Sequence, residues 1–408
     1  MKVIVVGGGA AGMMAAYAAA SYGCDVTLLE KNEKLGKKIY ITGKGRCNFT
    51  NACDVEDLFQ NVVSNPKFMY SAFYSFTNQQ VMDFVADHGT PYKVERGERV
   101  FPVSDHASDV TGAFQRALKS AGVKIMLNTE VKGLRVQNGV ICGVDTVDGP
   151  MEADRVIVCT GGLSYPTTGS TGDGVRFAEK LGHSIATLRP ALVPMNTKED
   201  YILAMQGLSL KNVELTIYHG KKKLYDAFGE MLFTHFGVSG PLCLSASSRV
   251  GKYLDDASLQ AEIDLKPKLD KDTLDQRLLR EFKGNENKKI SNVLGSLLPK
   301  KMIPVFMEIL EFAEDKKINS VTVEERNEII RLLKHFPFTI VSLRSFKEAI
   351  VTQGGVSVKE INPSTMESKL VEGLYFAGEV LDIDCYTGGF NLQVAWSTGY
   401  LAGMCAAS

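Results

Sequence analysis

The feature that most constrains this chain is a charge-free run from Val3 to Cys24 that contains three consecutive glycines. Four β-branched residues, Val3 to Val6, come first, then the glycines, then an alanine-rich segment that ends at Gly23. A run this apolar also suits a signal peptide or a membrane span. Adjacent glycines in a G-x-G-x-x-G spacing are instead typical of a strand, a tight turn and a helix packed closely on a sheet.

The spacing of this unit predicts a dinucleotide-binding site. Gly7 permits the tight turn, Gly9 lets the backbone approach a pyrophosphate, and Gly12 allows close packing of the helix on the strand. Free N–H groups and the dipole at the helix N-terminus favour the phosphates. Glu30 closes a second strand 18 residues after Gly12, near the offset of about 20 at which an acid binds ribose hydroxyls. A glycine-rich turn that binds nothing is the alternative, and the strand, helix and acid together disfavour it.

The next polar loop favours a flavin over a nicotinamide as the continuation of the dinucleotide. Residues 42–51 read Thr-Gly-Lys-Gly-Arg-Cys-Asn-Phe-Thr-Asn, and such a loop so soon after the ribose acid is unusual in nicotinamide enzymes. Two later blocks fit the same cofactor. Residues 156–174 run from a buried strand into small residues and a helix start, and residues 373–399 run from a strand through Gly378 and Glu379 to a glycine pair and the last helix.

These blocks, with the first βα unit and residues 229–241, resemble the BaiN/YhiN-like flavoproteins, an aminoacetone oxidase family of FAD-binding enzymes, over nearly the full chain. More distantly, the chain is similar to the glutathione-reductase-type FAD fold of fumarate reductases and L-aspartate oxidases. The resemblance implies an α/β fold, in which a Rossmann-like FAD domain is interrupted by an inserted β-barrel-like domain and a helical subdomain. It also implies that Glu379 bonds the ribityl chain and that the backbone of Val131, at the end of a short strand, contacts adenine.

The motifs and the resemblance together predict a set of cofactor-binding residues spread over the whole chain. These are Gly7, Gly9, Ala11, Gly12, Glu30, Lys31, Gly43, Gly45, Arg46, Cys47, Asn48, Val131, Thr160, Gly161, Gly162, Gly378, Glu379, Gly389, Asn391 and Leu392. The predicted cofactor is FAD, with the N-terminus of the last helix facing the flavin ring. NAD(P)H is expected as a transient reductant, because the chain has one dinucleotide fingerprint.

Chain order predicts a domain that is split by an insertion. We expect an FAD-binding domain at residues 1–190 and 353–408, a β-rich inserted domain at 191–268 and 336–352, and a helical subdomain at 269–335. The alternating residues 213–218 predict a strand of a small antiparallel sheet or barrel. Residues 338–341 return as a strand that rejoins it. We expect the substrate to bind between the FAD domain and the insert.

Catalytic residues are harder to assign, since the flavin itself performs hydride chemistry and the protein needs to add orientation, electrostatics and one proton donor. Cys47 and His235 are the predicted catalytic residues. A histidine suits proton transfer near neutral pH, although His235 is equally well explained as the cap of a barrel turn. Cys47 is either a general acid or a residue that packs against the flavin.

Cysteine and histidine spacing disfavours two other kinds of chemistry. The eight cysteines contain no C-x-x-C pair, and Cys47 and Cys53 are separated by five residues, where the dithiol of flavin disulfide reductases has four. None of the six histidines lies at metal-ligand spacing from a cysteine or another histidine, so no metal is predicted. With the apolar run assigned to the dinucleotide unit, we expect a cytoplasmic location, reduced thiols and no stable membrane association.

Three functions remain open on these grounds. The leading hypothesis is an FAD-dependent oxidoreductase in which NAD(P)H reduces the flavin and the flavin reduces an activated C=C bond of a small molecule. The resemblance also allows a reductase that forms dihydrouridine in ribosomal RNA, or an oxygen-using oxidase of an amine such as aminoacetone.

Charge bears only on the RNA alternative. A net charge of −1 excludes a generally basic nucleic-acid binder. Residues 266–348 nevertheless carry 17 Lys plus Arg against 13 Asp plus Glu. Lysine doublets at 288–289, 300–301 and 316–317 either contact RNA or form a solvated face.

Overall fold

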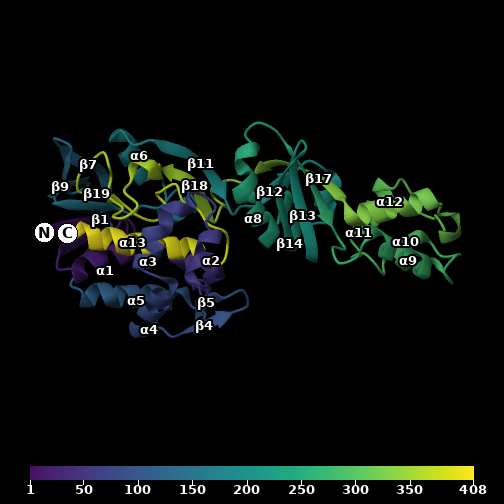
Figure 1. Cartoon of the computed structure of the whole chain (residues 1–408), viewed down its shortest axis with the longest axis horizontal. Coiled ribbons are helices and arrows are strands. Elements are labelled where there is room, and N and C mark those ends of the chain that lie inside the picture. The colour runs from purple at the N-terminus through teal and green to yellow at the C-terminus, as the bar shows by residue number, and fades with distance from the viewer. The chain divides into compact units, whose positions relative to one another are not determined.

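The computed structural model describes residues 1–408, apart from the side chain of Lys44. The chain forms two units, Met1–Ala191 with Ser345–Ser408, and Leu192–Arg344 (Figure 1). The expected return to the first domain at residue 353 falls inside β18 (Val351–Val356), which pairs antiparallel with β11 (Ile185–Ala191). This pairing places the whole of β18 in the first unit. Each unit has its own hydrophobic core.

A five-stranded parallel sheet forms the centre of the first unit. Its order is β19 (Leu374–Phe376), β10 (Arg155–Val158), β1 (Lys2–Val6), β2 (Asp25–Leu29) and β6 (Lys124–Met126). The strands are short and almost continuously apolar, as expected for a parallel sheet that is covered on both faces. All four neighbouring pairs are parallel, so their carboxyl ends lie along one edge.

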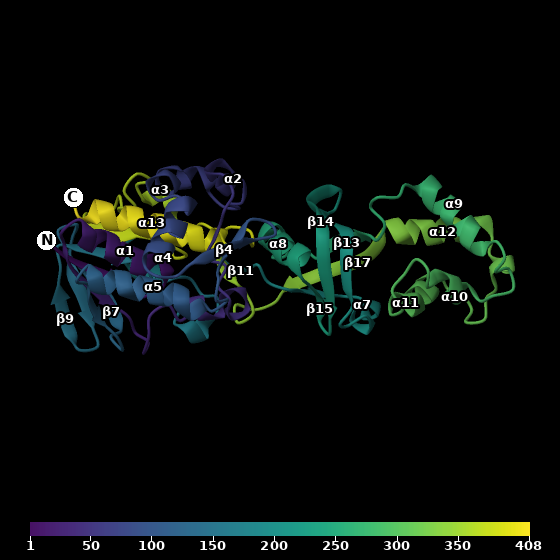
Figure 2. The same cartoon turned by 90° about the horizontal axis from the view of Figure 1, so that it is seen from below.

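Two helices made largely of small residues pack closely on each other beside this sheet. Figures 1 and 2 show α13 (Phe390–Ala406) alongside α1 (Ala10–Ser21). A Cβ added to Gly399 would overlap the carbonyl oxygen of Ala11, and one added to Gly403 would overlap that of Ala15. Because both contacts advance together along the two helices, α1 and α13 run in the same direction.

The remaining elements of the first unit surround this centre. One small sheet consists of β3 (Thr50–Asn51), β5 (Arg99–Pro102) and β4 (Tyr92–Glu95), a second of β7 (Val131–Gln137), β8 (Val140–Thr146) and β9 (Gly149–Glu152), and a third of β11 and β18. The α-helices around them are α2 (Val55–Gln60), α3 (Tyr70–Ser75), α4 (Asn78–Asp87), α5 (Ala107–Ser120) and α6 (Asp173–Lys180).

The second unit contains a closed six-stranded barrel. The strand order is β12 (Met195–Thr197), β15 (Gly237–Ser239), β14 (Lys222–Thr234), β13 (Ser209–His219), β16 (Leu259–Asp264) and β17 (Phe336–Leu343). In β13, Val213, Leu215 and Ile217 are buried while the residues between them are half-buried, which is the alternation that predicted a strand. The helices of this unit are α7 (Asp200–Ala204), α8 (Pro241–Val250), α9 (Lys271–Phe282), α10 (Ile290–Leu294), α11 (Met302–Ile309) and α12 (Val323–Lys334).

The predicted fold class is therefore confirmed, including the barrel and the helical segment after it. The charge-free run that begins at Val3 divides between β1 and α1, whose apolar side chains are buried in the core. Among the described residues, no helix combines the length and the apolarity that a membrane crossing needs.

A buried histidine connects α6 to the segment that precedes β19. His183 is 3% exposed; its Nδ1 lies 3.2 Å from the Ala178 carbonyl oxygen and its Nε2 lies 2.8 Å from Ser368 Oγ. A carbonyl only accepts, so Nδ1 carries the proton of the neutral ring and Ser368 donates to Nε2. Ser368 Oγ also accepts from the backbone N–H groups of Leu370 and Val371, both at 3.0 Å. A second ring proton therefore finds no acceptor at Ser368.

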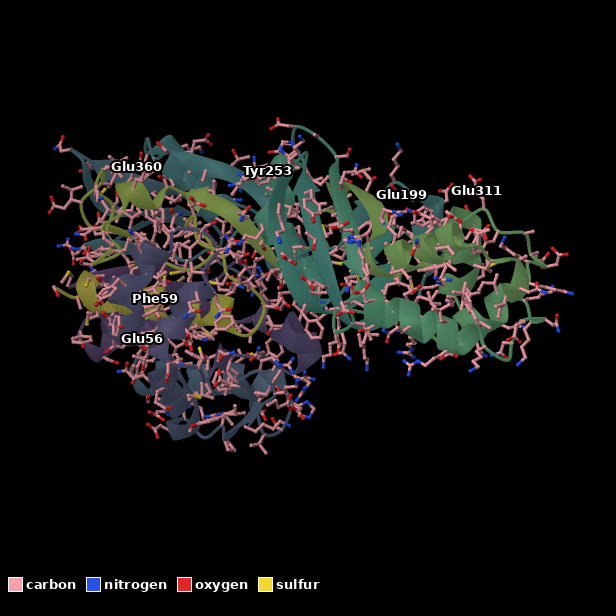
Figure 3. All side chains as sticks on the ribbon, turned by 45° about the vertical axis from the view of Figure 1, so that its right-hand side comes forward. Glu56, Phe59, Glu199, Tyr253, Glu311 and Glu360 are labelled. Carbon is pink, nitrogen blue, oxygen red and sulfur yellow. The ribbon has the colours of Figure 1, made fainter. Side chains whose placement is uncertain are left out.

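This arrangement predicts a loss of stability in acid. Burial lowers the pKa of His183 below its ordinary value, and the Ala178 carbonyl and the Glu360 carboxylate offset that shift only in part. Glu360, labelled in Figure 3, is itself held by the N–H and hydroxyl of Ser184, each at 2.7 Å. The unfolded chain protonates this histidine at about pH 6.5, and the folded chain at a lower pH. The contribution is present above about pH 6.5 and is lost as the pH falls below it.

We expect His183→Gln to lose less stability than the wild type between about pH 8 and about pH 5.5, measured by urea unfolding. The matched control is His106→Gln, at an exposed position in the same unit, which should follow the wild type. Equal losses in all three proteins would contradict the assignment.

Candidate functional site

The parallel sheet brings four of the predicted segments to one edge. Val6 lies opposite both Leu29 and Val158, and Val158 lies opposite Phe376. The residues that follow these strands include the first glycine turn, Glu30, Thr160 to Gly162, and Gly378 with Glu379. In open α/β sheets, ligands bind outside the carboxyl ends of the strands. The sheet thus explains why segments so distant in sequence form one site.

The three fingerprint glycines have different surroundings. Gly7 has a φ of 103°, and a Cβ there would lie 2.6 Å from the carbonyl oxygen of Cys159; a Cβ on Gly12 would overlap the carbonyl oxygen of Gly7. Gly9 is different, because its backbone is extended and a Cβ there would meet nothing within 4 Å. The packing of the fold requires glycine at positions 7 and 12, whereas Gly9 borders open space.

That open space lies at a helix end that no side chain caps. Gly9 is the N-cap of α1 and makes no side-chain hydrogen bond to it, so the N–H groups of the first turn remain available to a ligand. Free amides, the positive end of the helix dipole and open space beside Gly9 suit a pyrophosphate. The residues present therefore fit the phosphates of FAD.

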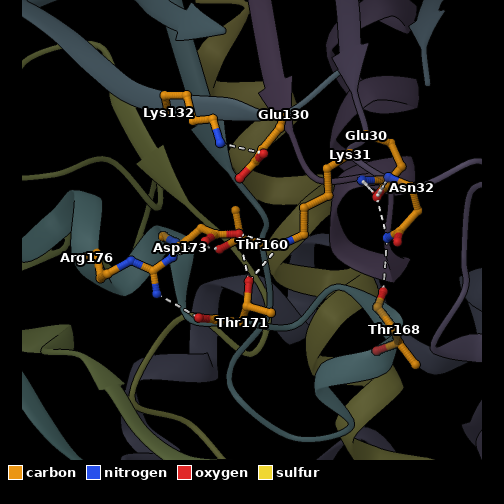
Figure 4. A network of polar contacts seen from close by, with 12 residues as sticks. Glu30, Lys31, Asn32, Glu130, Lys132, Thr160, Thr168, Thr171, Asp173 and Arg176 are labelled. Atoms are coloured by element: carbon orange, nitrogen blue, oxygen red, sulfur yellow. Dashed lines mark hydrogen bonds and ion pairs between the residues drawn. The ribbon is translucent and has the colours of Figure 1, made fainter. Parts of the chain in front are cut away.

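Glu30 is held in place by its neighbours (Figure 4). Its Oε2 accepts from the backbone N–H of Gly8 at 2.7 Å, and its Oε1 accepts from the N–H and the side-chain amide of Asn32 at 2.8 and 2.7 Å. Asn32 also donates to the carbonyl of Thr168 at 3.1 Å. Asn32 was missed by the sequence analysis; its place two residues after the ribose acid is the signal that could have found it. Oε2 accepts one hydrogen bond and so keeps a lone pair for a ribose hydroxyl.

Two of the predicted residues use their side chains within the protein. The Lys31 ammonium donates to Thr171 Oγ1 at 2.6 Å and to Asp173 Oδ2 at 2.5 Å, at the start of α6 (Figure 4). Thr160 Oγ1 accepts from the N–H of Gly174 in the same helix at 3.1 Å. Both contacts attach α6 to the sheet edge and leave the backbone groups of Lys31 and Thr160 as the candidates for cofactor contact.

Val131 lies at the start of β7, and the expectation that it ends a short strand was wrong. The preceding strand, β6, already ends at Met126. Next to Val131, the carboxylate of Glu130 pairs with Lys132 at 2.6 Å. The backbone of Val131 is therefore at a strand entry, and its contact with adenine stays a prediction.

The predicted flavin loop is attached to the sheet of β3, β5 and β4. Gly43 and Gly45 lie in a 3₁₀ segment, Ile39–Gly45, and both have positive φ. The Arg46 guanidinium pairs with Glu95 Oε1 at 2.5 Å and with Asp105 Oδ1 at 2.6 Å. These contacts contribute to holding the pKa of both carboxyls below their usual range; for Asp105, Lys93 contributes most.

Arg46 and Asn48 thus hold this loop in place. The guanidinium of Arg46 lies over the ring of Phe101, 4.2 Å from its centroid. Asn48 Oδ1 accepts from the N–H of Val100 at 3.1 Å. Both side chains bind other parts of the chain, and their cofactor contacts stay predictions.

The two predicted catalytic residues belong to different units. Cys47 is fully buried with a φ of 60°, and burial raises the pKa of its thiol to about 12. Its proton is held at neutral pH, while an apolar, buried thiol is otherwise inert. His235 is exposed in the turn between β14 and β15, where its ring lies edge-on to Phe236 at 4.9 Å. The catalytic roles of both residues stay predictions.

At the end of β19, Glu379 is surrounded by donors. Its Oε1 accepts from Ser164 Oγ and from the N–H of Thr352, both at 2.7 Å, and its Oε2 accepts from Lys38 Nζ at 2.6 Å. The sequence analysis missed these three residues. A signal for Thr352 was present, because it lies two residues before the pair Gly354-Gly355.

Small residues beside Glu379 let the surrounding segments approach one another. A Cβ on Gly162 would overlap Thr352 Oγ1, and one on Gly378 would lie 2.7 Å from the Cβ of Ala11. Gly161 has a φ of 70°, and a Cβ there would lie 3.8 Å from Glu379 Oε2.

The last helix begins with a second uncapped N-terminus. Gly389 is the N-cap of α13, with a φ of 99° and no side-chain hydrogen bond to the helix. Asn391 bonds both the N–H and the carbonyl of Cys385, each at 3.0 Å, so its amide fixes the preceding loop. Leu392 is half-buried against the core.

The packing of the helices sets the distance between their two N-termini. Gly399 lies against Ala11, so α13 begins about eight residues, or roughly 12 Å, ahead of α1 along their common direction. In extended FAD the pyrophosphate lies in the middle, so the flavin ring is displaced from the phosphates along the molecule. We therefore expect both helix N-termini to face one ligand.

No three His, Cys, Asp or Glu side chains described here are grouped so that they could hold a metal. All eight cysteines are free thiols.

The chain is an FAD-dependent oxidoreductase with a Rossmann-type cofactor domain. The chain belongs to the HI0933-like family, since the family model described as "HI0933-like protein Rossmann domain" matches residues 1–405. The resemblance to BaiN/YhiN-like flavoproteins is thereby confirmed.

Two curated relatives align over almost the whole chain. A 3-dehydro-bile acid delta(4,6)-reductase of Clostridium scindens is 31% identical over 410 residues, covering 100% of this chain and 99% of the relative. A ribosomal RNA dihydrouridine synthase of Haemophilus influenzae is 33% identical over 403 residues, covering 97% and 96%.

Among solved structures, the 3-ketosteroid delta1-dehydrogenase of Sterolibacterium denitrificans superposes with a TM-score of 0.53 at 12% identity, covering 99% of each chain. This likeness supports the fold.

Gly9 offers the sharpest test of the pyrophosphate site. Because its backbone is extended and its surroundings are open, Gly9→Ala should leave the stability of the apoprotein within about 0.5 kcal/mol. The added methyl group would occupy the space assigned to the phosphates, so we expect FAD affinity to fall by about tenfold or more. Flavin content, FAD titration of the apoprotein and thermal unfolding measure these effects.

The control is Gly133→Ala in β7, where a Cβ meets only Asp145 Oδ2 at 3.8 Å. Full flavin content in Gly9→Ala would show that the phosphates bind elsewhere.

Proposed function

We propose that this flavoprotein takes hydride from NAD(P)H and delivers it to an activated C=C bond of a small-molecule substrate. The observation that carries the proposal is the full-length similarity to a 3-dehydro-bile acid delta(4,6)-reductase. Its name denotes the reduction of double bonds in a steroid-like acid. The net reaction adds one hydride from NAD(P)H and one proton to the alkene.

The chain contributes binding, orientation and a proton. FAD, when bound, supplies the hydride chemistry. The first turn of α1 and Glu30 are proposed to bind its phosphates and ribose, and the first turn of α13 favours negative charge at its N-terminus. Cys47 and His235 are alternative proton donors. Cys47 holds its proton through burial, and His235 is accessible to solvent.

Anaerobic rapid mixing tests the proposal. NADH or NADPH should bleach the flavin absorbance of the purified holoprotein, and an α,β-unsaturated ketone steroid should restore it with formation of the saturated product. If neither NADH nor NADPH bleaches the flavin, the NAD(P)H-fed reaction is ruled out. Rapid reoxidation by air with peroxide release, in the presence of aminoacetone, would indicate an oxidase instead. Of Cys47→Ala and His235→Gln, the variant that slows the second half-reaction more than the first identifies the proton donor.

A second candidate function is reduction of uridine in ribosomal RNA. The full-length relative from Haemophilus influenzae carries that activity in its name, and a further one from Escherichia coli is 29% identical. Dihydrouridine is uridine with its ring C=C bond saturated, so the same hydride chemistry applies.

The lysine doublets of the second unit are unequal candidates for RNA contact. Lys316 pairs with Glu325 at 2.8 Å, and Lys301 donates to the Gln206 carbonyl at 2.6 Å. Lys288 and Lys289 are exposed, and we propose this doublet as the RNA contact if RNA is the substrate.

Mass spectrometry of ribosomal RNA from a deletion strain decides between the two substrates. If RNA is the substrate, dihydrouridine disappears on deletion and returns with the wild-type gene. Lys288→Glu with Lys289→Glu should then restore it poorly, while Lys252→Glu, an exposed lysine of the same unit, restores it fully. Unchanged dihydrouridine in the deletion strain would remove this candidate.

A further inference from the structure

Lys38 lies in the segment between Glu30 and the flavin loop, and its side chain reaches the end of β19. Its Nζ lies 2.6 Å from Glu379 Oε2 and 2.6 Å from Ser164 Oγ. The side chains of Lys38 and Glu379 are 22% and 20% exposed. The pair is thus mostly withdrawn from water, where an ion pair is screened less than on an open surface.

The two oxygens of Glu379 differ in their remaining capacity. Oε1 already accepts two hydrogen bonds, from Ser164 Oγ and from the N–H of Thr352, and a carboxylate oxygen has about two acceptor positions. Oε2 accepts one hydrogen bond, from Lys38. The oxygen with a lone pair to spare is therefore the one that Lys38 holds.

The network behind Glu379 is rigid enough to make this orientation specific. Thr352 Oγ1 accepts from the N–H groups of Leu163 and Ser164 at 2.8 and 3.0 Å, and it is fully buried. Ser164, also fully buried, donates to Oε1. Gly161 lies beside Oε2: a Cβ there would be 3.8 Å from that oxygen and 3.0 Å from Ser170 Oγ.

We propose that Lys38 is a positioning residue of the cofactor site. It holds Oε2 of Glu379 so that the remaining lone pair accepts a hydrogen bond from a hydroxyl of the flavin's polyol chain. Lys38 acts through Glu379 and makes no contact of its own with the phosphates. The inference rests on the proposed role of Glu379 toward the ribityl chain and is independent of the reductant and the substrate.

A double-mutant cycle on cofactor affinity tests this role. FAD is titrated into deflavinated wild type, Lys38→Met, Glu379→Gln and the double variant, and flavin fluorescence reports binding. Hydrogen bonds to charged groups are stronger than those between neutral groups, so each single variant should bind FAD at least about tenfold more weakly. If Lys38 acts through Glu379, the double variant binds no more weakly than Glu379→Gln alone.

Three further measurements separate positioning from other effects. Lys38→Arg, which keeps the charge, should recover most of the affinity. ADP, which has the phosphates but no polyol chain, should bind Lys38→Met as tightly as the wild type. Lys34→Met, at an exposed lysine over the ring of Tyr40, should bind FAD normally, and thermal unfolding of each apoprotein checks folding.

The proposal would be overturned if the losses of FAD affinity in the two single variants multiplied in the double variant, or if Lys38→Met also lost ADP affinity. Either result would mean that Lys38 contacts the cofactor directly. Normal FAD binding by Lys38→Met would overturn it as well. All these measurements omit NAD(P)H and substrate, so their failure is distinct from failure of the proposed reaction.

Discussion

The close contact between α1 and α13 is the constraint on which the rest of the first unit depends. Gly399 and Gly403 bring the backbone of α13 against the carbonyl groups of Ala11 and Ala15, and no larger side chain fits there. Because the helices run in the same direction, both N-termini point the same way. Gly378, at the end of β19, packs on the same Ala11. One seam of small residues therefore sets the sheet edge and both helix ends in fixed relation.

Buried hydrogen bonds connect α13 to the predicted flavin loop. Trp396 Nε1 donates to the carbonyl of Phe49 at 2.9 Å, and Thr50 Oγ1 donates to Gln393 Oε1 at 2.5 Å. The indole of Trp396 also stacks on Phe114, with ring centroids 4.3 Å apart. Satisfied buried networks of this kind specify one arrangement, since each unmade bond would cost about 1–3 kcal/mol. The predicted flavin loop is thus held in place by α13, the helix whose N-terminus we expect to face the cofactor.

The sequence was informative where local geometry decides and silent where distant side chains meet. The βα unit, the barrel and the last helix could be predicted, because glycine spacing and strand alternation act over a few residues. The partners of Glu379 could not, since Lys38, Ser164 and Thr352 come from three segments that only the folded sheet edge brings together. For the same reason, Arg46 and Lys31 were assigned to the cofactor from position alone, while their ion pairs with Glu95 and Asp173 depend on tertiary structure.

These contacts also bear on how one cofactor domain serves relatives that act on substrates as different as a bile acid and ribosomal RNA. The residues that hold Glu30 and Glu379 all belong to the first unit. The position of both carboxylates is therefore set without any contribution from the second unit. The second unit has its own core and its own barrel, so its surface can vary without disturbing the helix seam or the carboxylates. A cofactor site stabilised from within its own unit leaves the sequence of the second unit free to vary between relatives.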